Sequence, residues 1–81
     1  TFSLNCAYFG IPCIGNKKVD TQRICHPDLS VDVDDVEKAR KLAKRLKEDK
    51  SFYKMCSEMS KMIYQEIYIL DKYKEKLNKI L

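Results

Sequence analysis

The chain has 81 residues, of which 44% are hydrophobic and 35% are charged, and 16 lysines and arginines against 12 acids give a net charge of +4. A chain of this length folds as a single domain, 1–81, and buries only about 60% of the surface that its unfolded form exposes. This excludes a large apolar core, so the fold needs a further source of stability. The net charge is ordinary for a soluble domain and does not by itself indicate a polyanionic partner.

Four cysteines form the most informative pattern, and they are Cys6, Cys13, Cys25 and Cys56. An even number of cysteines without a Cys-x-x-Cys pair, in a chain this short, favours disulfides in an oxidising compartment over a metal or redox site. In each of the three ways to form two disulfides, Cys56 pairs with an N-terminal cysteine. Such a bridge stabilises by about 4 kcal/mol in the chain-entropy model. We therefore expect a secreted, extracellular protein, and the start at Thr1 without a leader suits a mature chain.

Residues 1–30 hold both glycines and both prolines, and we expect this segment to be irregular, with short helical turns or a hairpin. Within it, Ser3–Phe9 is compatible with one helical turn. Gly10 would end that turn, because glycine tolerates the left-handed conformation that closes a helix.

Two alternatives are open for the residues that follow. Gly15–Asn16 suits the two-residue turn of a hairpin made of Ile11–Ile14 and Lys17–Asp20. The alternative is a short helix over Asp20–Cys25, capped by its first residue and interrupted by Pro27.

The first strong helix is predicted over about 33–48. Asp32 and Asp34 are candidate N-caps, and Glu37 lies three residues after Asp34 in the spacing of a capping box. We expect the helix to end near Glu48. One narrow stripe of it is apolar and consists of Val36, Ala39, Leu42, Ala43 and Leu46.

A second helix is predicted over about 52–80, where neither glycine nor proline occurs, and Asp49 or Ser51 is its candidate cap. A seam of residues along it repeats at alternating spacings of four and three, which is typical of a helix that packs along another helix. The seam consists of Phe52, Cys56, Met59, Ile63, Glu66, Leu70, Tyr73, Leu77 and Ile80, with Glu66 as its one charged member. This helix is about 45 Å long and the first about 24 Å, so the first cannot cover it.

These elements predict an all-α fold, a small disulfide-stapled helical domain. The irregular N-terminal segment packs on an antiparallel pair of helices, with 31–81 as the helical hairpin. The end of the second helix, Leu70–Leu81, is then left for a folded-back segment or for another molecule.

Several patterns invite a chemical interpretation, and each has a simpler one. Cys25 and His26 are adjacent, but neighbours in sequence usually point apart, and a catalytic dyad is assembled in space. A zinc site of three cysteines and His26 lacks the short Cys-x2-4-Cys knuckle. The acids Asp32, Asp34 and Asp35 lack the glycine and distal glutamate of a calcium loop, and helix capping explains them. We expect no enzymatic activity, no catalytic residue, no metal and no other cofactor.

The first helix also carries a basic patch, which consists of Lys38, Lys41, Lys44 and Arg45. Such a patch is compatible with a membrane surface. It is more simply the solvated face of an amphipathic helix. No aromatic residue interleaves it and no nucleic-acid recognition motif occurs, which argues against nucleic acid as the partner.

The second helix is rich in methionine and tyrosine, which is typical either of a core or of a protein-binding surface. We expect its partner-binding residues to be Tyr64, Tyr68, Leu70, Tyr73 and Leu77. The composition as a whole resembles that of venom, salivary and effector proteins as a class. The leading hypothesis is therefore a secreted, non-enzymatic protein-binding factor of toxin, salivary or host-directed effector type, with self-association as an option.

Two alternatives remain. One is a cationic membrane-active or antimicrobial helical protein. The other is a carrier of a small apolar ligand, which would need a dry cavity lined by Met59, Met62 and Ile63.

Overall fold

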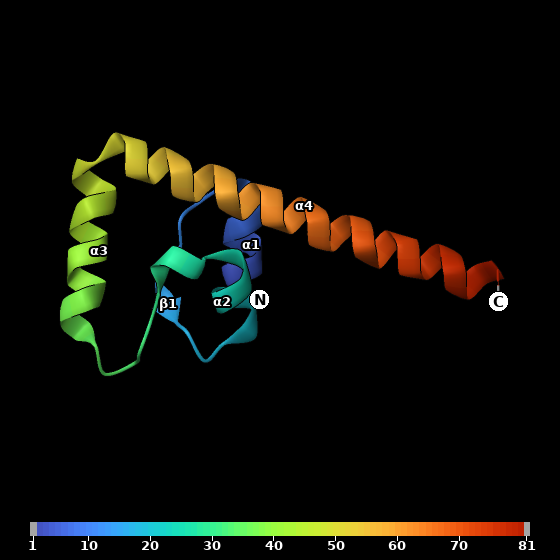
Figure 1. The fold of residues 1–81 in the computed structure, drawn as a ribbon, viewed down its shortest axis with the longest axis horizontal. Helices are drawn as coiled ribbons and strands as arrows, with labels where there is room; N and C mark the ends of the chain where they lie inside the picture. The colour runs from blue at the N-terminus through green and yellow to red at the C-terminus, as the bar shows by residue number, and fades with distance from the viewer. Residues whose placement is uncertain (1, 81) are drawn as a thin grey trace.

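The computed structural model describes residues 2–80, except for the side chain of Ile80. The elements in chain order are α1 (Phe2–Phe9), β1 (Gly15–Asn16), α2 (Asp20–Cys25), the 3-10 turn η1 (Pro27–Leu29), β2 (Ser30–Val31), α3 (Val36–Glu48) and α4 (Lys50–Ile80). The predicted all-α class is confirmed. The molecule measures 50 × 27 × 15 Å, because α4 runs its whole length while every other element lies near one end (Figure 1).

Helix α1 ends at Gly10, as the sequence predicted, and begins one residue earlier than expected. Gly10 has φ +70°, its N–H donates to the Ala7 carbonyl at 3.1 Å, and the Ile11 N–H donates to the Cys6 carbonyl at 2.8 Å. This pattern is a Schellman motif, which satisfies carbonyls that the helix end would leave unpaired. The Ser57 hydroxyl of α4 donates to the Gly10 carbonyl, so the same turn attaches α1 to α4.

The predicted hairpin around Gly15–Asn16 is wrong. These residues form β1, which pairs in parallel with β2, Gly15 opposite Ser30. The alternative helix over Asp20–Cys25 is confirmed as α2, and it provides the crossover that parallel strands require. The reason is Gln22, whose amide donates to the Cys13 carbonyl at 2.7 Å and so draws the chain into α2. The predicted cap is wrong, because the N-cap is Val19 and no side chain caps this helix.

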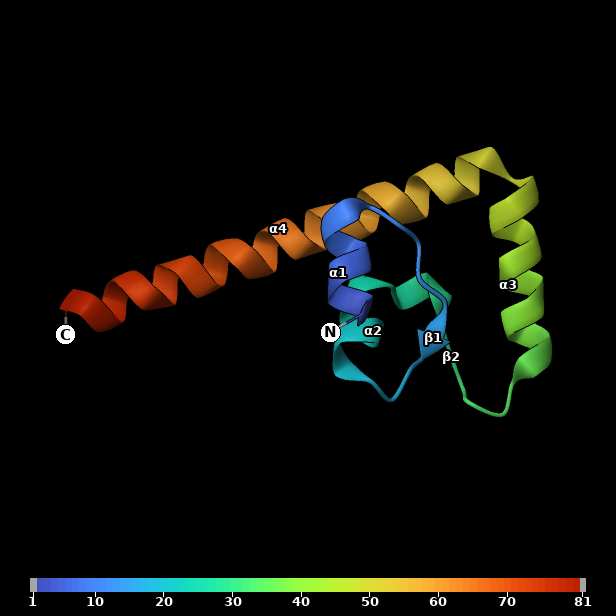
Figure 2. The same ribbon diagram turned by 180° about the vertical axis from the view of Figure 1, so that it is seen from behind.

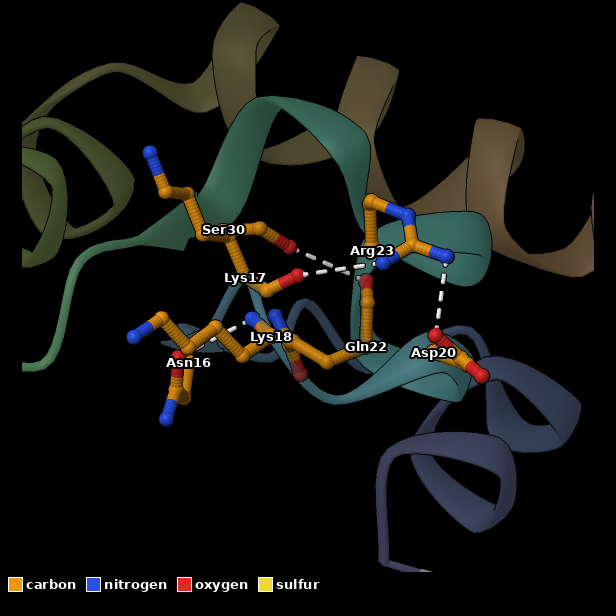
Figure 3. A network of polar contacts seen from close by, with 7 residues as sticks. All are labelled: Asn16, Lys17, Lys18, Asp20, Gln22, Arg23 and Ser30. Atoms are coloured by element: carbon orange, nitrogen blue, oxygen red, sulfur yellow. Dashed lines mark hydrogen bonds and ion pairs between the residues drawn. The ribbon is translucent and has the colours of Figure 1, made fainter.

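Side chains around α2 hold this crossover in place (Figure 3). The Ser30 hydroxyl donates to the Gln22 carbonyl at 3.0 Å, which joins β2 to α2. Arg23 pairs with Asp20 at 2.9 Å on the exposed side of the same helix.

The N-cap of α3 is Asp35 rather than Asp32 or Asp34. The Asp35 carboxylate accepts from the Lys38 N–H at 3.0 Å. Each of the three acids can act as a cap. Asp32 instead forms an ion pair with Lys17 at 3.1 Å. The end of α3 at Glu48 is as predicted.

The predicted antiparallel arrangement of the two long helices is wrong. Asp49 alone joins α3 to α4, in an extended conformation, and its carboxylate accepts from the Phe52 N–H at 3.0 Å. An antiparallel helix pair needs a loop of about two to five residues. With one residue the chain makes a corner, and α3 leaves the start of α4 at a steep angle (Figures 1 and 2).

The core is small and forms where the N-terminal elements, α3 and α4 meet. Leu29, Phe52 and Cys56 are its buried centre, and Leu42 and Leu46 of α3 pack against them half-buried. No residue of α3 is fully buried. The buried hydrophobic residues include all four cysteines, so sulfur makes up much of the core.

The predicted disulfides are absent from the described residues, where all four cysteines are free thiols. The staple therefore stays a prediction.

Replacing Gly10 with Ala tests the junction of α1 with α4. A non-glycine residue in the left-handed region costs about 1–2 kcal/mol. A Cβ at this position would also lie 2.7 Å from Lys61 Cδ. We expect the free energy of unfolding, measured by urea denaturation, to fall by at least this amount.

The same substitution in a Lys61→Ala background separates the two causes. The backbone cost persists there, whereas the clash with Lys61 disappears and only the tight contact with Ser57 Oγ at 3.0 Å remains. An unchanged midpoint for Gly10→Ala would contradict the left-handed turn.

Candidate binding site

Helix α4 is buried along one side of its first half and projects freely in its second half. Cys56 and Ser60 are buried, with Ser60 fully inaccessible. From Tyr68 to Lys79 every side chain is exposed. Leu70, Tyr73 and Leu77 thus lack intramolecular cover, as the length of the helix predicted, and they are 59%, 61% and 40% exposed.

The predicted residues Tyr64 and Tyr68 belong to an open groove between α1 and α4. The groove has a volume of about 460 Å³ and is lined by Tyr8, Lys61, Tyr64, Gln65, Tyr68 and Ile69. The rings of Tyr8 and Tyr64 meet edge to face, with centroids 5.3 Å apart. Tyr64 and Tyr68, one helical turn apart, are stacked at 6.4 Å. The side of the groove is therefore a continuous aromatic surface.

Sequence reasoning missed Tyr8 as a site residue. It comes from α1, and the contact of α1 with α4 at Gly10 and Ser57 brings it to Tyr64. The available signal was the pair Tyr8-Phe9, two large aromatic side chains directly before a helix end.

Two lysines lie beside the aromatic side chains. Lys61 lines the groove, and the Lys72 ammonium lies 5.5 Å from the centroid of the Tyr68 ring. Such a cation beside an aromatic face adds a modest attraction. Two cations therefore border the groove, and one of them, Lys72, also pairs with Glu75 at 3.5 Å.

The remaining predicted binding residues do not join the groove. Leu70, Tyr73 and Leu77 lie on a different side of α4 from Tyr64 and Tyr68, since 100° per residue separates the two sets by more than 100° around the helix axis. Helix α4 thus presents two separate exposed faces.

The methionines are more exposed than a core would require. Met55, Met59 and Met62 border an open depression together with Ser51, Lys54 and Glu58. Met55 is 43% exposed and Met62 54%. This open, partly charged surface differs from the dry cavity that a carrier of apolar ligands would need.

The basic patch of Lys38, Lys41, Lys44 and Arg45 is exposed along α3, as predicted. Lys41 pairs loosely with Glu37 at 3.8 Å. Arg45 has a second role, because its guanidinium lies 3.9 Å from the centroid of the buried Phe52 ring. Arg45 therefore belongs partly to the core.

Cys25 and His26 are both buried. His26 Nε2 lies 3.0 Å from the Ser3 carbonyl, so this nitrogen carries the hydrogen, and no partner of Nδ1 is found among the described residues. Burial raises the pKa of the Cys25 thiol, which opposes the thiolate that a nucleophile needs. Burial likewise is the main cause that raises the pKa of Cys13 and of Cys56.

Within residues 2–80, no group of three or more His, Cys, Asp or Glu side chains is placed to hold a metal ion. In the same part of the chain, no helix combines the length and the apolar character needed to cross a membrane. The chain matches no family model, no curated protein and no solved structure.

Proposed function

We propose that this protein is a secreted, non-enzymatic binding factor, of toxin, salivary or host-directed effector type, that acts on a protein target. The observation that carries the proposal is the aromatic groove of Tyr8, Tyr64 and Tyr68. Tyrosines bury much area with little loss of side-chain entropy, and for this reason they dominate many protein-binding surfaces.

The target segment is expected to carry a large apolar or aromatic side chain with acidic neighbours. The groove is open to solvent along α4, which suits a protuberance of a protein better than an enclosed small ligand. Lys61 and Lys72 lie beside the tyrosines and would pair with the acidic neighbours.

A membrane-active protein is the second candidate, and the exposed basic face of α3 favours it. From Glu37 to Glu48 this helix carries six lysines and arginines against two acids. Anionic lipid attracts such a face.

We further propose that the secreted protein contains two disulfides, Cys6–Cys13 and Cys25–Cys56. The Schellman turn at Gly10 folds the chain back, so that Cys13 lies against the face of α1 that carries Ser3 and Cys6. Cys13 Sγ is 4.0 Å from the Ser3 hydroxyl, and Ser3 precedes Cys6 by three residues on the same face of α1.

The other two thiols share one small cavity. Cys25 and Cys56 line it together with Leu29 and Met59. Each bridge forms when two thiols pass two electrons and two protons to a disulfide oxidant, such as oxidised glutathione, which leaves as two thiols. The second bridge would join α2 to α4 and reinforce the small core.

The binding proposal is tested by selecting peptides from a random phage-displayed library on the oxidised protein. We expect enriched peptides to carry an aromatic residue flanked by Asp or Glu. One enriched peptide is then synthesised, and its dissociation constant is measured by calorimetry. Tyr8→Ala and Tyr68→Ala should each raise this constant at least tenfold, since both remove part of the groove. Asn78→Ala on the same helix is the matched control. Peptides that bind Tyr68→Ala as tightly as the unaltered protein would refute the groove as the binding site.

The membrane alternative is tested with Lys38→Gln, Lys41→Gln and Lys44→Gln combined. Arg45 is kept, because its contact with Phe52 contributes about 0.5–2 kcal/mol. We expect the triple variant to fold normally, since exposed charges contribute little to stability. If the unaltered protein binds phosphatidylglycerol vesicles and causes dye leakage, and the triple variant does neither, the protein is membrane-active. Absence of leakage with the unaltered protein would favour the protein partner.

The disulfide pairing is tested by mass spectrometry without reduction, which should show a mass four hydrogens below that of the sequence. After trypsin, the proposed pairing gives an internally bridged peptide 1–17 and a separate pair of peptides, 24–38 joined to 55–61. Either other pairing would join all three peptides into one species. Four reactive thiols in the protein isolated from its secreting source would contradict the extracellular proposal as well.

A further inference from the structure

A second heptad series lies on the exposed side of α4, and we name it the outer stripe. It consists of Met55, Met59, Met62, Glu66, Ile69 and Tyr73, which follow one another at alternating spacings of four and three residues. Met62, Ile69 and Tyr73 are 54%, 64% and 61% exposed. A regular apolar series of this kind is the pattern by which one helix packs along another.

From Met62 onward the outer stripe faces away from the rest of the molecule, whereas Met59 is half-buried and borders the small cavity that Cys25 and Leu29 line. The opposite side of α4 carries Ser57, which bonds to Gly10, and Tyr64, which meets Tyr8. In Figures 1 and 2 all the N-terminal elements lie to one side of α4, and its C-terminal half projects with nothing beside it. Beyond Met59, a second helix can therefore lie along the stripe without meeting the N-terminal elements.

We propose that the outer stripe binds the same stripe of a second copy of this chain, with the two α4 helices antiparallel. In the register that matches charge, Met62 faces Tyr73 of the second copy, and Ile69 faces Glu66 of the second copy. The sulfur of methionine packs favourably against an aromatic ring. Such a two-fold contact is self-complementary, as closed dimers require.

The charges that flank the stripe select this orientation. Glu58 would lie beside Lys79 of the second copy, and Gln65 beside Lys72. These residues are exposed, and their pairings within α4 are loose, with Glu58 3.9 Å from Lys54 and Lys72 3.5 Å from Glu75. The exchange for an intermolecular partner therefore costs little.

A parallel arrangement in register is disfavoured by like charges. It would place Glu66 against Glu66 of the second copy and, one step beyond the stripe, Lys76 against Lys76. The antiparallel register instead brings Lys72 of the second copy next to Glu66. A carboxylate in the middle of an apolar stripe then has a cation beside it, which reduces the cost of burying it.

This contact adjoins the groove to which the proposed function assigns the target. Tyr8, Tyr64 and Tyr68 lie on the other side of α4, whereas Gln65, Ile69 and Lys72 lie at the border and belong to both surfaces. A contact over Met59–Lys76 is about 27 Å long. That is small beside a standard interface of about 1,600 Å², so we expect a dimer in the micromolar range.

The test is sedimentation equilibrium of the oxidised full chain from about 1 to about 300 μM, a range that covers micromolar dimerisation. We expect the unaltered protein to dimerise. Glu58→Lys and Lys79→Glu should each raise the dissociation constant about tenfold, because each turns two attractive pairs into repulsive ones. The double variant should return to within about threefold of the unaltered protein, since it restores opposite charges across the dimer.

Three controls make the result specific. Lys74→Glu makes the same charge change as Lys79→Glu but lies off the stripe, so it should leave dimerisation unchanged. Tyr68→Ala in the groove should also leave it unchanged, whereas Tyr73→Ser should weaken it. Circular dichroism verifies that each variant keeps its helix.

A monomer throughout the concentration range would overturn the proposal. Failure of the double variant to recover, or equal effects of Lys74→Glu and Lys79→Glu, would overturn the antiparallel register. None of these outcomes bears on peptide binding by the groove, which Tyr8→Ala and Tyr68→Ala test independently.

Discussion

The packing of Phe52 and Cys56 against Leu29 is the contact on which the remaining structure depends. It joins the start of α4 to the N-terminal elements, and Leu42 and Leu46 of α3 complete it. Apolar burial of about 25 cal/mol per Å² is the main stabilising force in such a cluster. With so few large side chains buried, the N-terminal elements are held to α4 by a narrow margin, and polar contacts such as Ser57 to Gly10 matter correspondingly more.

This position of the core has a direct consequence for binding. The core lies near the start of α4, so it covers one side of the first half of that helix and none of the second. Exposed apolar residues therefore continue along the second half of α4, past the N-terminal elements. Contiguous apolar surface of this kind on a small protein is uncommon unless another molecule covers it.

Features that depend on the chemistry of neighbouring residues could be predicted from the sequence. Gly10 ended α1 because few other residues adopt φ +70°, and Asp49 marked the start of α4 because its carboxylate satisfies a free N–H of the first turn. The long helix itself followed from periodicity and from the absence of glycine and proline over about 52–80. These determinants act within a few residues of the position that they define.

Features that depend on distant contacts were predicted wrongly or not at all. The hairpin at Gly15–Asn16 was wrong because these residues pair with β2, fifteen residues further along the chain, and because the Gln22 side chain takes the Cys13 carbonyl that a hairpin would have bonded locally. Of the six residues that line the groove, the sequence analysis named two, Tyr64 and Tyr68, which stack one turn apart on α4. Tyr8 was missed because nothing in the local sequence shows which helix α1 will contact.

The long helix shows why periodicity alone could not locate the exposed face. The seam that contains Phe52 and the outer stripe that contains Met55 have the same alternating spacing and share Met59, Glu66 and Tyr73. Either series alone would suit a helix with one buried face. The structure separates them, because Phe52 and Cys56 are buried whereas Met55 and Met62 are exposed. A helix that is apolar over this much of its circumference, with the domain on one side, has surface left for more than one neighbour. Such surface supports the proposal that the protein binds other chains.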